Sequence, residues 1–354
     1  MGLETLWFVL IAVLWGGYFV LEGFDFGVGM LLPFLPRKGS EDQRAVMFES
    51  IGPVWDGNEV WLVVAGGATF AAFPAWYATM FSGFYLALLL VLACLIVRVV
   101  SFEWREKSEN PRWRAVWLRL NTAGSIGASF LWGVALANLL HGVPLNSSHG
   151  FAGDFLDLFS GYTVLAGLAV VCLFALHGAS YLCLRTVGDL RERAAATARR
   201  LSLLAAVLAL AFLAWTVVVA HNRNQRAIVP VAIPAAVAAV ALLLAFWFVR
   251  TRHEGRAFAM TGLGVIALVA TLFTGLYPRV LVSHPTFANS LTISNAATGH
   301  YALVVITIVA AIFLPLILLY QGWTYHVFRK RLSGEPVPSP VAAAGAHTGP
   351  AAPG

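Results

Sequence analysis

Long apolar segments with few charges dominate this sequence, and they restrict the chain to a fold inside a membrane. Nine segments hold about 20 or more mostly apolar residues, the length that a helix needs to cross a bilayer. The chain is 59% hydrophobic and only 11% charged over 354 residues, which is unlike a soluble domain. The sequence therefore predicts an all-α, polytopic membrane protein with nine transmembrane helices. They are expected near 6–35, 50–73, 76–99, 116–140, 161–184, 200–220, 228–250, 257–281 and 301–328.

The distribution of basic residues predicts the orientation of these helices. All but three of the 23 Lys and Arg residues lie by the connections after the first, third, fifth and seventh segments or after the last one; the exceptions are Arg223, Arg226 and Arg279. Basic residues collect on the cytoplasmic side of membrane proteins, so we expect the N-terminus outside and the C-terminus in the cytoplasm. The net charge of +6 then needs no nucleic-acid partner. Residues 333–354 are rich in Ala, Gly and Pro, and we expect a disordered cytoplasmic tail after a membrane domain formed by residues 1–332.

Carboxylic acids interrupt the first apolar segment, where a bilayer does not readily accept charge. Asp25 is expected about ten residues, or roughly 15 Å, from the cytoplasmic end of the first helix. Glu22 lies three residues earlier and so shares its face. Gly23 and Gly27 form a pair of small residues at helical spacing, which predicts the close approach of another helix.

The second apolar segment carries acids as well. Asp56 is expected about six residues, or roughly 9 Å, above the cytoplasmic start of the second helix. Glu49 comes seven residues earlier, on the same stripe, and Glu59 three residues later. Glu103 marks the inner end of the third helix. All of these acids are therefore predicted in the cytoplasmic half of the membrane.

Acids inside a membrane usually face the protein interior or water and mark functional sites. A series of protonatable groups that opens toward the cytoplasm is suited to proton uptake. A purely structural interpretation remains open, in which Asp25 and Asp56 hydrogen-bond between the first two helices or pair with Arg98. For Glu49 and Glu103, which are expected near the membrane–water interface, solvation by water is the alternative interpretation.

A haem or metal site would need clustered His, Met or Cys ligands, and the sequence offers none that we recognise. Only His177 of the nine histidines lies well within a span, and a hydrogen bond to a neighbour is its expected role. We therefore expect no directly bound cofactor and no metal. The aromatic residues around Pro74 are typical of an interfacial belt, and the alternative is an apolar corridor for a small gas or a quinone tail.

Three motifs give a more specific indication. Residues 22–29 (EGFDFGVG), 55–61 (WDGNEVW) and 81–85 (FSGFY) resemble subunit II of the cytochrome bd-type quinol oxidases of bacteria. The similarity continues through 98–107, 138–144, 184–190 and 289–292, and it covers nearly all of residues 3–332. The low-complexity tail lies outside it.

The resemblance implies the haem-free subunit of a heterodimeric quinol:O2 oxidoreductase of aerobic respiration in the bacterial cell membrane. Haems b and d are then expected in the partner, subunit I. The implied fold is two four-helix bundles plus a ninth, peripheral helix. A structural quinone or lipid in this chain and small single-helix accessory subunits are compatible with the resemblance.

At the level of residues, the resemblance implies that Asp25, Asp56 and Glu103 belong to a cytoplasmic proton path, to which we add Glu22 and Glu49 from their positions. Trp61 matches a tryptophan beside a proposed oxygen route. Most relatives have Asp where Glu22 and Glu103 stand, and many have Gln at Glu59, whose role we leave unassigned. The rival function is a secondary transporter that uses its intramembrane carboxylates, and a third is a purely structural scaffold.

Overall fold

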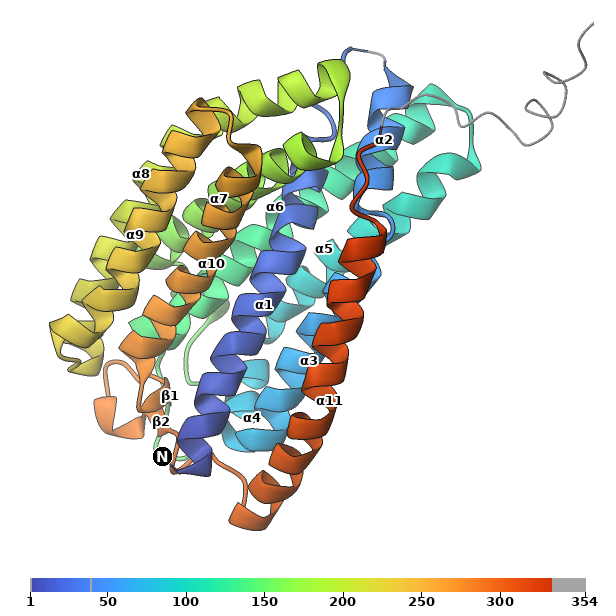
Figure 1. Cartoon of the computed structure of the whole chain (residues 1–354). Helices are drawn as coiled ribbons and strands as arrows, with labels where there is room; N and C mark the ends of the chain where they lie inside the picture. Colours follow the sequence, from blue (N-terminus) through green and yellow to red (C-terminus); the bar gives the residue numbers. More distant parts are fainter. Residues whose placement is uncertain (1, 39, 333–354) are drawn as a thin grey trace, which may run out of the picture.

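The computed structural model describes residues 2–38 and 40–332, and this part of the chain is almost entirely helical (Figure 1). The predicted disordered tail, 333–354, lies outside the described residues. Two short strands, β1 (Arg279–Leu281) and β2 (Leu291–Thr292), pair in antiparallel fashion, and short 3₁₀ turns cover Arg105–Lys107, Phe155–Leu158 and Phe287–Asn289. The helices are α1 (Leu3–Leu31), α2 (Glu41–Ile51), α3 (Trp55–Ala72), α4 (Pro74–Gly83), α5 (Tyr85–Trp104), α6 (Pro111–His141), α7 (Gly161–Arg185), α8 (Gly188–Asn224), α9 (Ile228–Arg250), α10 (Glu254–Leu276) and α11 (His300–Val327).

Eight helices of the described chain are long and apolar enough to cross a membrane: α1, α5, α6, α7, α8, α9, α10 and α11. This supports the prediction of a polytopic, all-α membrane protein. The segment predicted at 50–73 differs, because α2 ends at Ile51 and α3 begins at Trp55. Pro53 has no N–H to continue the helix across this break. The expectation that Glu49 and Asp56 share one stripe of one helix is therefore wrong.

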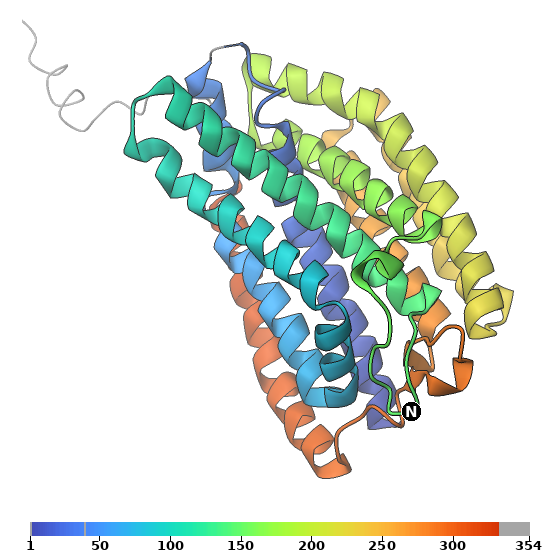
Figure 2. The same cartoon turned by 180° about the vertical axis from the view of Figure 1, so that it is seen from behind.

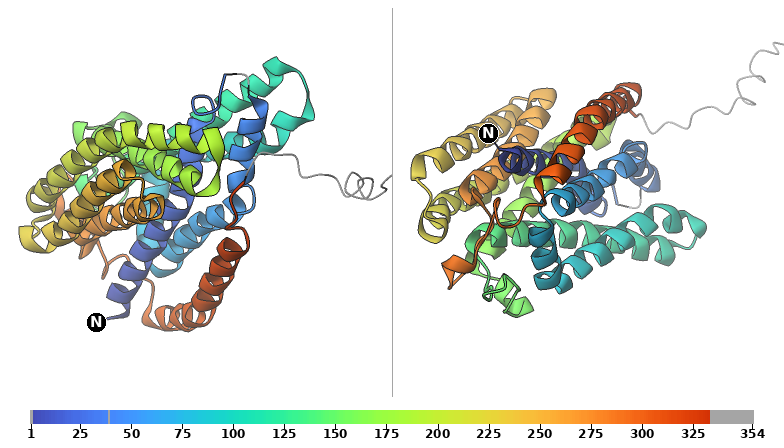
Figure 3. Two further views of the ribbon diagram at one scale, coloured as in Figure 1. Left: turned by 45° about the horizontal axis from the view of Figure 1, so that its top comes forward. Right: turned by 90° about the horizontal axis from the view of Figure 1, so that it is seen from below.

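Helix α1 lies at the centre of the molecule and contacts α3, α6, α7, α10 and α11. Viewed from below, α1 separates the group with α9 and α10 from the group with α3 and α4 (Figure 3). Helices α7, α8, α9 and α10 pack against one another, and α5 packs along α6 on the far side (Figure 2). By contrast, α11 is peripheral, because Leu303 is its only buried residue.

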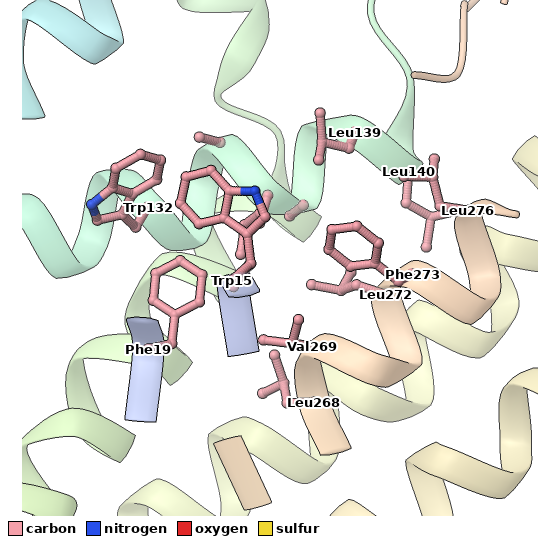
Figure 4. Close-up of a cluster of buried hydrophobic side chains, with 14 of the residues drawn as sticks. Trp15, Phe19, Trp132, Leu139, Leu140, Leu268, Val269, Leu272, Phe273 and Leu276 are labelled. Atoms are coloured by element: carbon pink, nitrogen blue, oxygen red, sulfur yellow. The ribbon is translucent and has the colours of Figure 1, made fainter. Parts of the chain in front are cut away.

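Large side chains from α1, α6 and α10 fill the centre of the molecule. Trp15 and Phe19 of α1 meet Trp132 of α6, with ring centroids 5.1 and 6.1 Å apart respectively, beside Phe273 of α10 (Figure 4). These side chains are all buried. Because lipid tails are as apolar as these residues, close packing rather than escape from water stabilises such a centre.

The closest helix crossing is formed by glycines of α1 and α7. A Cβ atom added at Gly27 would lie 2.0 Å from the carbonyl oxygen of Phe174, and one at Gly178 would lie 2.4 Å from the carbonyl carbon of Gly27. A Cβ at Gly23 would meet the Phe174 ring at 2.8 Å. The predicted close approach at Gly23 and Gly27 is therefore confirmed, and the partner helix is α7.

We expect Gly178→Ala to destabilise the protein by about 1–3 kcal/mol, because the added methyl group meets backbone that cannot move aside cheaply. Thermal unfolding of the purified protein would measure this loss. Gly16→Ala is the matched control on α1, since a Cβ there meets nothing within 4 Å. An unchanged unfolding temperature for Gly178→Ala would contradict the close crossing.

Candidate functional site

A completely buried arginine, Arg98, joins an acid of α1 to an acid of α3. Arg98 lies on α5, and its Nη1 atom is 2.5 Å from Glu22 Oε1 of α1 and 3.3 Å from Glu59 Oε2 of α3. The guanidinium also lies over the Phe26 ring, 4.8 Å from its centroid. A buried charge is tolerated only when it is paired. Arg98 therefore explains how Glu22, which is itself fully buried, can be placed inside the protein.

Asp25 lies one turn further along α1 and has different partners. Its Oδ2 atom accepts a hydrogen bond of 2.7 Å from Asn58 Nδ2 of α3. Asp25 is fully buried, and its Oδ1 atom has no hydrogen-bond partner in the described chain. This carboxyl group thus keeps one oxygen available while the other is fixed between α1 and α3.

The amide of Asn58 is in turn oriented by the peripheral helix α11. Its Oδ1 atom accepts hydrogen bonds from Gln321 Nε2 at 3.0 Å and from the Tyr325 hydroxyl at 2.7 Å. Because two donors fix the carbonyl end, the NH₂ end of the amide must point toward α1. There it donates to Asp25 and, at 3.4 Å, to the carbonyl of Leu21.

The other predicted acids lie at the surface of the chain. Asp56, Glu49 and Glu103 are all exposed. The Trp55 and Phe102 rings are 5.3 Å apart, so Asp56 and Glu103 lie on helix ends that touch. This is the end of the molecule at which α2 lies (Figure 1). The structure thus separates a buried pair of acids on α1 from an exposed group of acids near this end.

Two predicted positions along the helices need correction. Asp25 lies six residues, or roughly 9 Å, from the end of α1, because α1 ends at Leu31 rather than at residue 35. Asp56 is the second residue of α3 and does not lie six residues inside a helix. Both errors arise because helix ends near Pro33 and Pro53 cannot be located from hydropathy alone.

Sequence reasoning missed Asn58, Gln321 and Tyr325, and it considered Arg98 only as an alternative partner for Asp25 or Asp56. In the structure the salt bridges of Arg98 go to Glu22 and Glu59 instead. The signal was present in the sequence, because Asn58 stands among the acids of its motif and Gln321 interrupts an apolar helix. Only the fold shows that Asn58 meets Gln321 and Tyr325, which lie 263 and 267 positions further along the chain.

The buried histidine, His177, has a hydrogen-bond partner at each ring nitrogen. His177 Nδ1 lies 2.6 Å from the Thr261 hydroxyl and Nε2 lies 3.2 Å from the carbonyl oxygen of Val20. Its ring stacks on Phe258 at 4.5 Å. Both ring nitrogens are therefore engaged, as the sequence suggested. Within the described ranges no three His, Cys, Asp or Glu residues are grouped so that they could hold a metal ion.

A cavity of about 570 Å³ lies among the aromatic residues around Pro74, with an almost entirely apolar lining. It lies where α3 and α4 face α5 and α6, and Trp15 of α1 contributes to its wall. Trp61 is not part of this lining and instead packs over Gly17 of α1. Aromatic side chains of this region thus line a cavity as well as cover the surface. All aromatic residues of the cavity wall, including one from α1 and one from α6, are Trp15, Phe70, Trp76, Tyr77, Phe81, Tyr85 and Trp132.

Comparison with known proteins identifies the family of this chain. The family model described as cytochrome bd terminal oxidase subunit II matches residues 3–328. The chain belongs to this family. The resemblance inferred from the three motifs is therefore confirmed.

Named relatives match the subunit II chain over nearly its whole length. It is 41% identical to cytochrome bd ubiquinol oxidase subunit 2 of Bacillus subtilis, over 94% of this chain and 97% of that protein. It is 36% identical to cytochrome bd-I ubiquinol oxidase subunit 2 of Escherichia coli K12, over 95% of this chain and 96% of that protein. In fold it is similar to a chain of the bd oxidase structure from Geobacillus thermodenitrificans, with a TM-score of 0.72 at 20% identity, over 93% of this chain and 99% of that chain.

We expect Arg98→Gln to destabilise the protein by about 3–5 kcal/mol, because it leaves the buried Glu22 without a counter-charge. Arg112→Gln is a suitable control, since the side chain of Arg112 is exposed at the start of α6. The midpoint of unfolding by denaturant would measure both variants. Equal stability of the two would show that the Arg98 ion pairs do not hold the acids in place.

Proposed function

We propose that this chain is the haem-free subunit II of a quinol:O2 oxidoreductase in the bacterial cell membrane. Membership of the subunit II family and the near-complete coverage of named bd oxidase subunits carry this proposal. The haems b and d would be held by subunit I, in agreement with the engaged nitrogens of His177. The role of this subunit is then to stabilise the haem-bearing partner and to supply it with protons. Lipid surrounds the assembly, and small single-helix accessory subunits belong to the same proposal.

We further propose nine spans, with the N-terminus outside and the C-terminus in the cytoplasm. Eight of them are the long apolar helices, and α3 is the ninth. Helix α3 has 18 residues, slightly fewer than a bilayer usually requires, and its start carries Asp56 and Glu59. The excess of basic residues beside α2 and the other connections at that end supports its assignment to the cytoplasmic side. Two bundles of four, α1 with α3, α5 and α6, and α7 to α10, with a peripheral α11, agree with the helix contacts.

The proposed proton path runs from the exposed acids to the buried ones. Asp56, Glu103 and Glu49 would collect protons at the cytoplasmic surface, and Glu22 and Asp25 would pass them into the protein toward subunit I. The arrangement of charges supports this path. Glu22 and Glu59 share the single guanidinium of Arg98, and the fully buried Asp25 lies one turn from Glu22, so full ionisation would leave a net negative charge in this part of the protein. Because such a charge is costly, these carboxyl groups form a site at which protons can be held.

Oxygen consumption by the assembled oxidase tests the path. We expect Asp25→Asn to lower turnover at least tenfold, because an amide cannot exchange a proton as a carboxylic acid does, and proton transfer of this kind contributes 10²–10⁴-fold. Asparagine at position 25 keeps an oxygen that can accept from Asn58. The same direction is expected for Asp56→Asn.

Asp42→Asn is the matched control, because Asp42 is another exposed acid at the same end of the molecule. Haem content must be equal in all preparations, so that a loss of turnover is separated from a loss of assembly. Wild-type turnover in fully assembled Asp25→Asn and Asp56→Asn oxidases would refute the path. Loss of haem without loss of turnover per haem would instead indicate a scaffold. A colourless chain that purifies without a haem-rich partner would favour the transporter.

For the apolar cavity, we propose that it takes a structural quinone or a lipid chain. Its volume of about 570 Å³ is typical of a small-molecule site, and its wall offers aromatic and aliphatic side chains to an isoprenoid or acyl chain. An oxygen route past Trp61 remains a separate proposal, since this residue lies outside the cavity wall.

Gly66→Leu should reduce the amount of quinone or lipid that co-purifies with the oxidase, because its side chain would occupy space in the cavity. Extraction followed by mass spectrometry would measure the ratio of each lipid to protein. Val60→Leu is the control on the same helix, since Val60 is 50% exposed and does not line the cavity. The same ratio in both variants would exclude a bound chain at this place.

A further inference from the structure

A second cavity, of about 370 Å³, lies at the opposite end of the molecule from α2, where α6 ends, α7 begins and α8 ends. It differs from the apolar cavity because one part of its wall is polar. That part is formed by His141, Ser160, Asn222 and Arg223, and it contains no carboxylate. Hydrogen-bond donors and positive charge without an acid are the features of a site for an anion.

Arg223 is the only basic residue of this wall with a permanent charge, and it forms no salt bridge with the described residues. The salt bridges of the described residues all involve other basic side chains. The other two arginines of this end are held by neighbours. Arg279 donates to Asn224 Oδ1 at 3.1 Å and lies over Phe287, and Arg226 lies over Tyr277. The guanidinium of Arg223 therefore faces a cavity that contains no counter-ion from the described chain.

The electrostatic surroundings agree with this geometry. The pKa of the loop residue His284 is lowered, first by partial desolvation and then by the positive charge of Arg223. Two acids of the loop between α6 and α7, Asp154 and Asp157, bond within their own turn, where the Asp157 carboxylate accepts from the Asp154 N–H at 2.8 Å. No carboxylate of the wall therefore offsets the positive charge of Arg223.

The remaining wall is apolar and continues onto the lipid-facing surface of α8. Trp215 and Val218 belong to the cavity and are 44% and 52% exposed. Trp215 lies nine residues before the end of α8, or roughly 14 Å, whereas Arg223 lies at that end. Tyr162 forms the floor, with its ring stacked on His141 at 5.7 Å and edge-on to Trp215 at 5.9 Å. A free phosphate would use only the polar part, but an amphiphile would use both.

We propose that this cavity binds the phosphate headgroup of a phospholipid from the outer leaflet. Arg223 contacts the phosphate, Asn222 and His141 supply further donors, and an acyl chain follows Trp215 and Val218 along α8. Arginine suits this task, since its fork of N–H groups matches the oxygens of a phosphate. Trp215, roughly 14 Å from the end of α8, offers an aromatic surface to the acyl chain.

Native mass spectrometry of the whole oxidase, titrated with phosphatidylglycerol, tests this site. We expect the wild type to retain one more phosphatidylglycerol than Arg223→Gln, with at least a tenfold difference in apparent affinity, since a charge-assisted bond is lost. Arg223→Lys keeps the charge and should fall between the two. Arg226→Gln is the matched control at the same end and should bind like the wild type.

Three outcomes would overturn the proposal. Equal losses in Arg223→Gln and Arg226→Gln would mean that total charge, not this cavity, attracts the lipid. Equal retention of a diacylglycerol, which lacks the phosphate, would mean that only the apolar wall matters. Displacement of the lipid by millimolar inorganic phosphate would indicate a site for the free anion. Haem content measured for each variant confirms that the complexes compared are intact.

Discussion

The contact between Arg98 and Glu22 is the interaction on which the interior of this subunit depends. Both side chains are completely buried, and neither could be accommodated there without the other. Because Arg98 belongs to α5 and Glu22 to α1, their pairing joins two helices that otherwise have few backbone contacts. Glu59 adds α3 to the same guanidinium. Electrostatic pairing thus joins α1, α3 and α5 through one buried guanidinium group.

Packing differs between parts of the helix bundle. At the crossing of α1 with α7, glycines bring the backbones together, and no space remains. Between α3, α4 and α5, by contrast, large aromatic side chains surround the cavity of about 570 Å³. One half of the subunit is therefore closely packed, while the other combines a buried ionic cluster with an apolar cavity. Proton transfer is better served by the second half, because it needs groups that are not already fully engaged.

Much of this could be predicted from the sequence, and the rest could not, for a physical reason. Apolar length identified the membrane helices, and the rarity of intramembrane acids identified Glu22 and Asp25 as residues that need explanation. Hydropathy does not report where a helix ends, so the break before Trp55 was missed and Asp56 was placed too deep. Nor does it report contacts between distant segments. The pairing of Glu22 with Arg98 and the contact of Asn58 with Tyr325 depend on how helices are arranged, and several arrangements satisfy the same apolar pattern.

Helix α11 shows most clearly why the arrangement matters. It is almost unburied, so packing alone holds it weakly against the rest of the subunit. It nevertheless supplies two of the hydrogen bonds that orient Asn58, and Asn58 fixes one oxygen of Asp25. A displacement of α11 would release the Asn58 amide, which could then rotate and present its oxygen to the carboxyl group. Anything that presses on α11, such as a neighbouring subunit or lipid, would thereby alter the hydrogen bonding of Asp25. Through Asn58, the peripheral helix of the subunit thus takes part in the hydrogen bonding of one of its two fully buried acids.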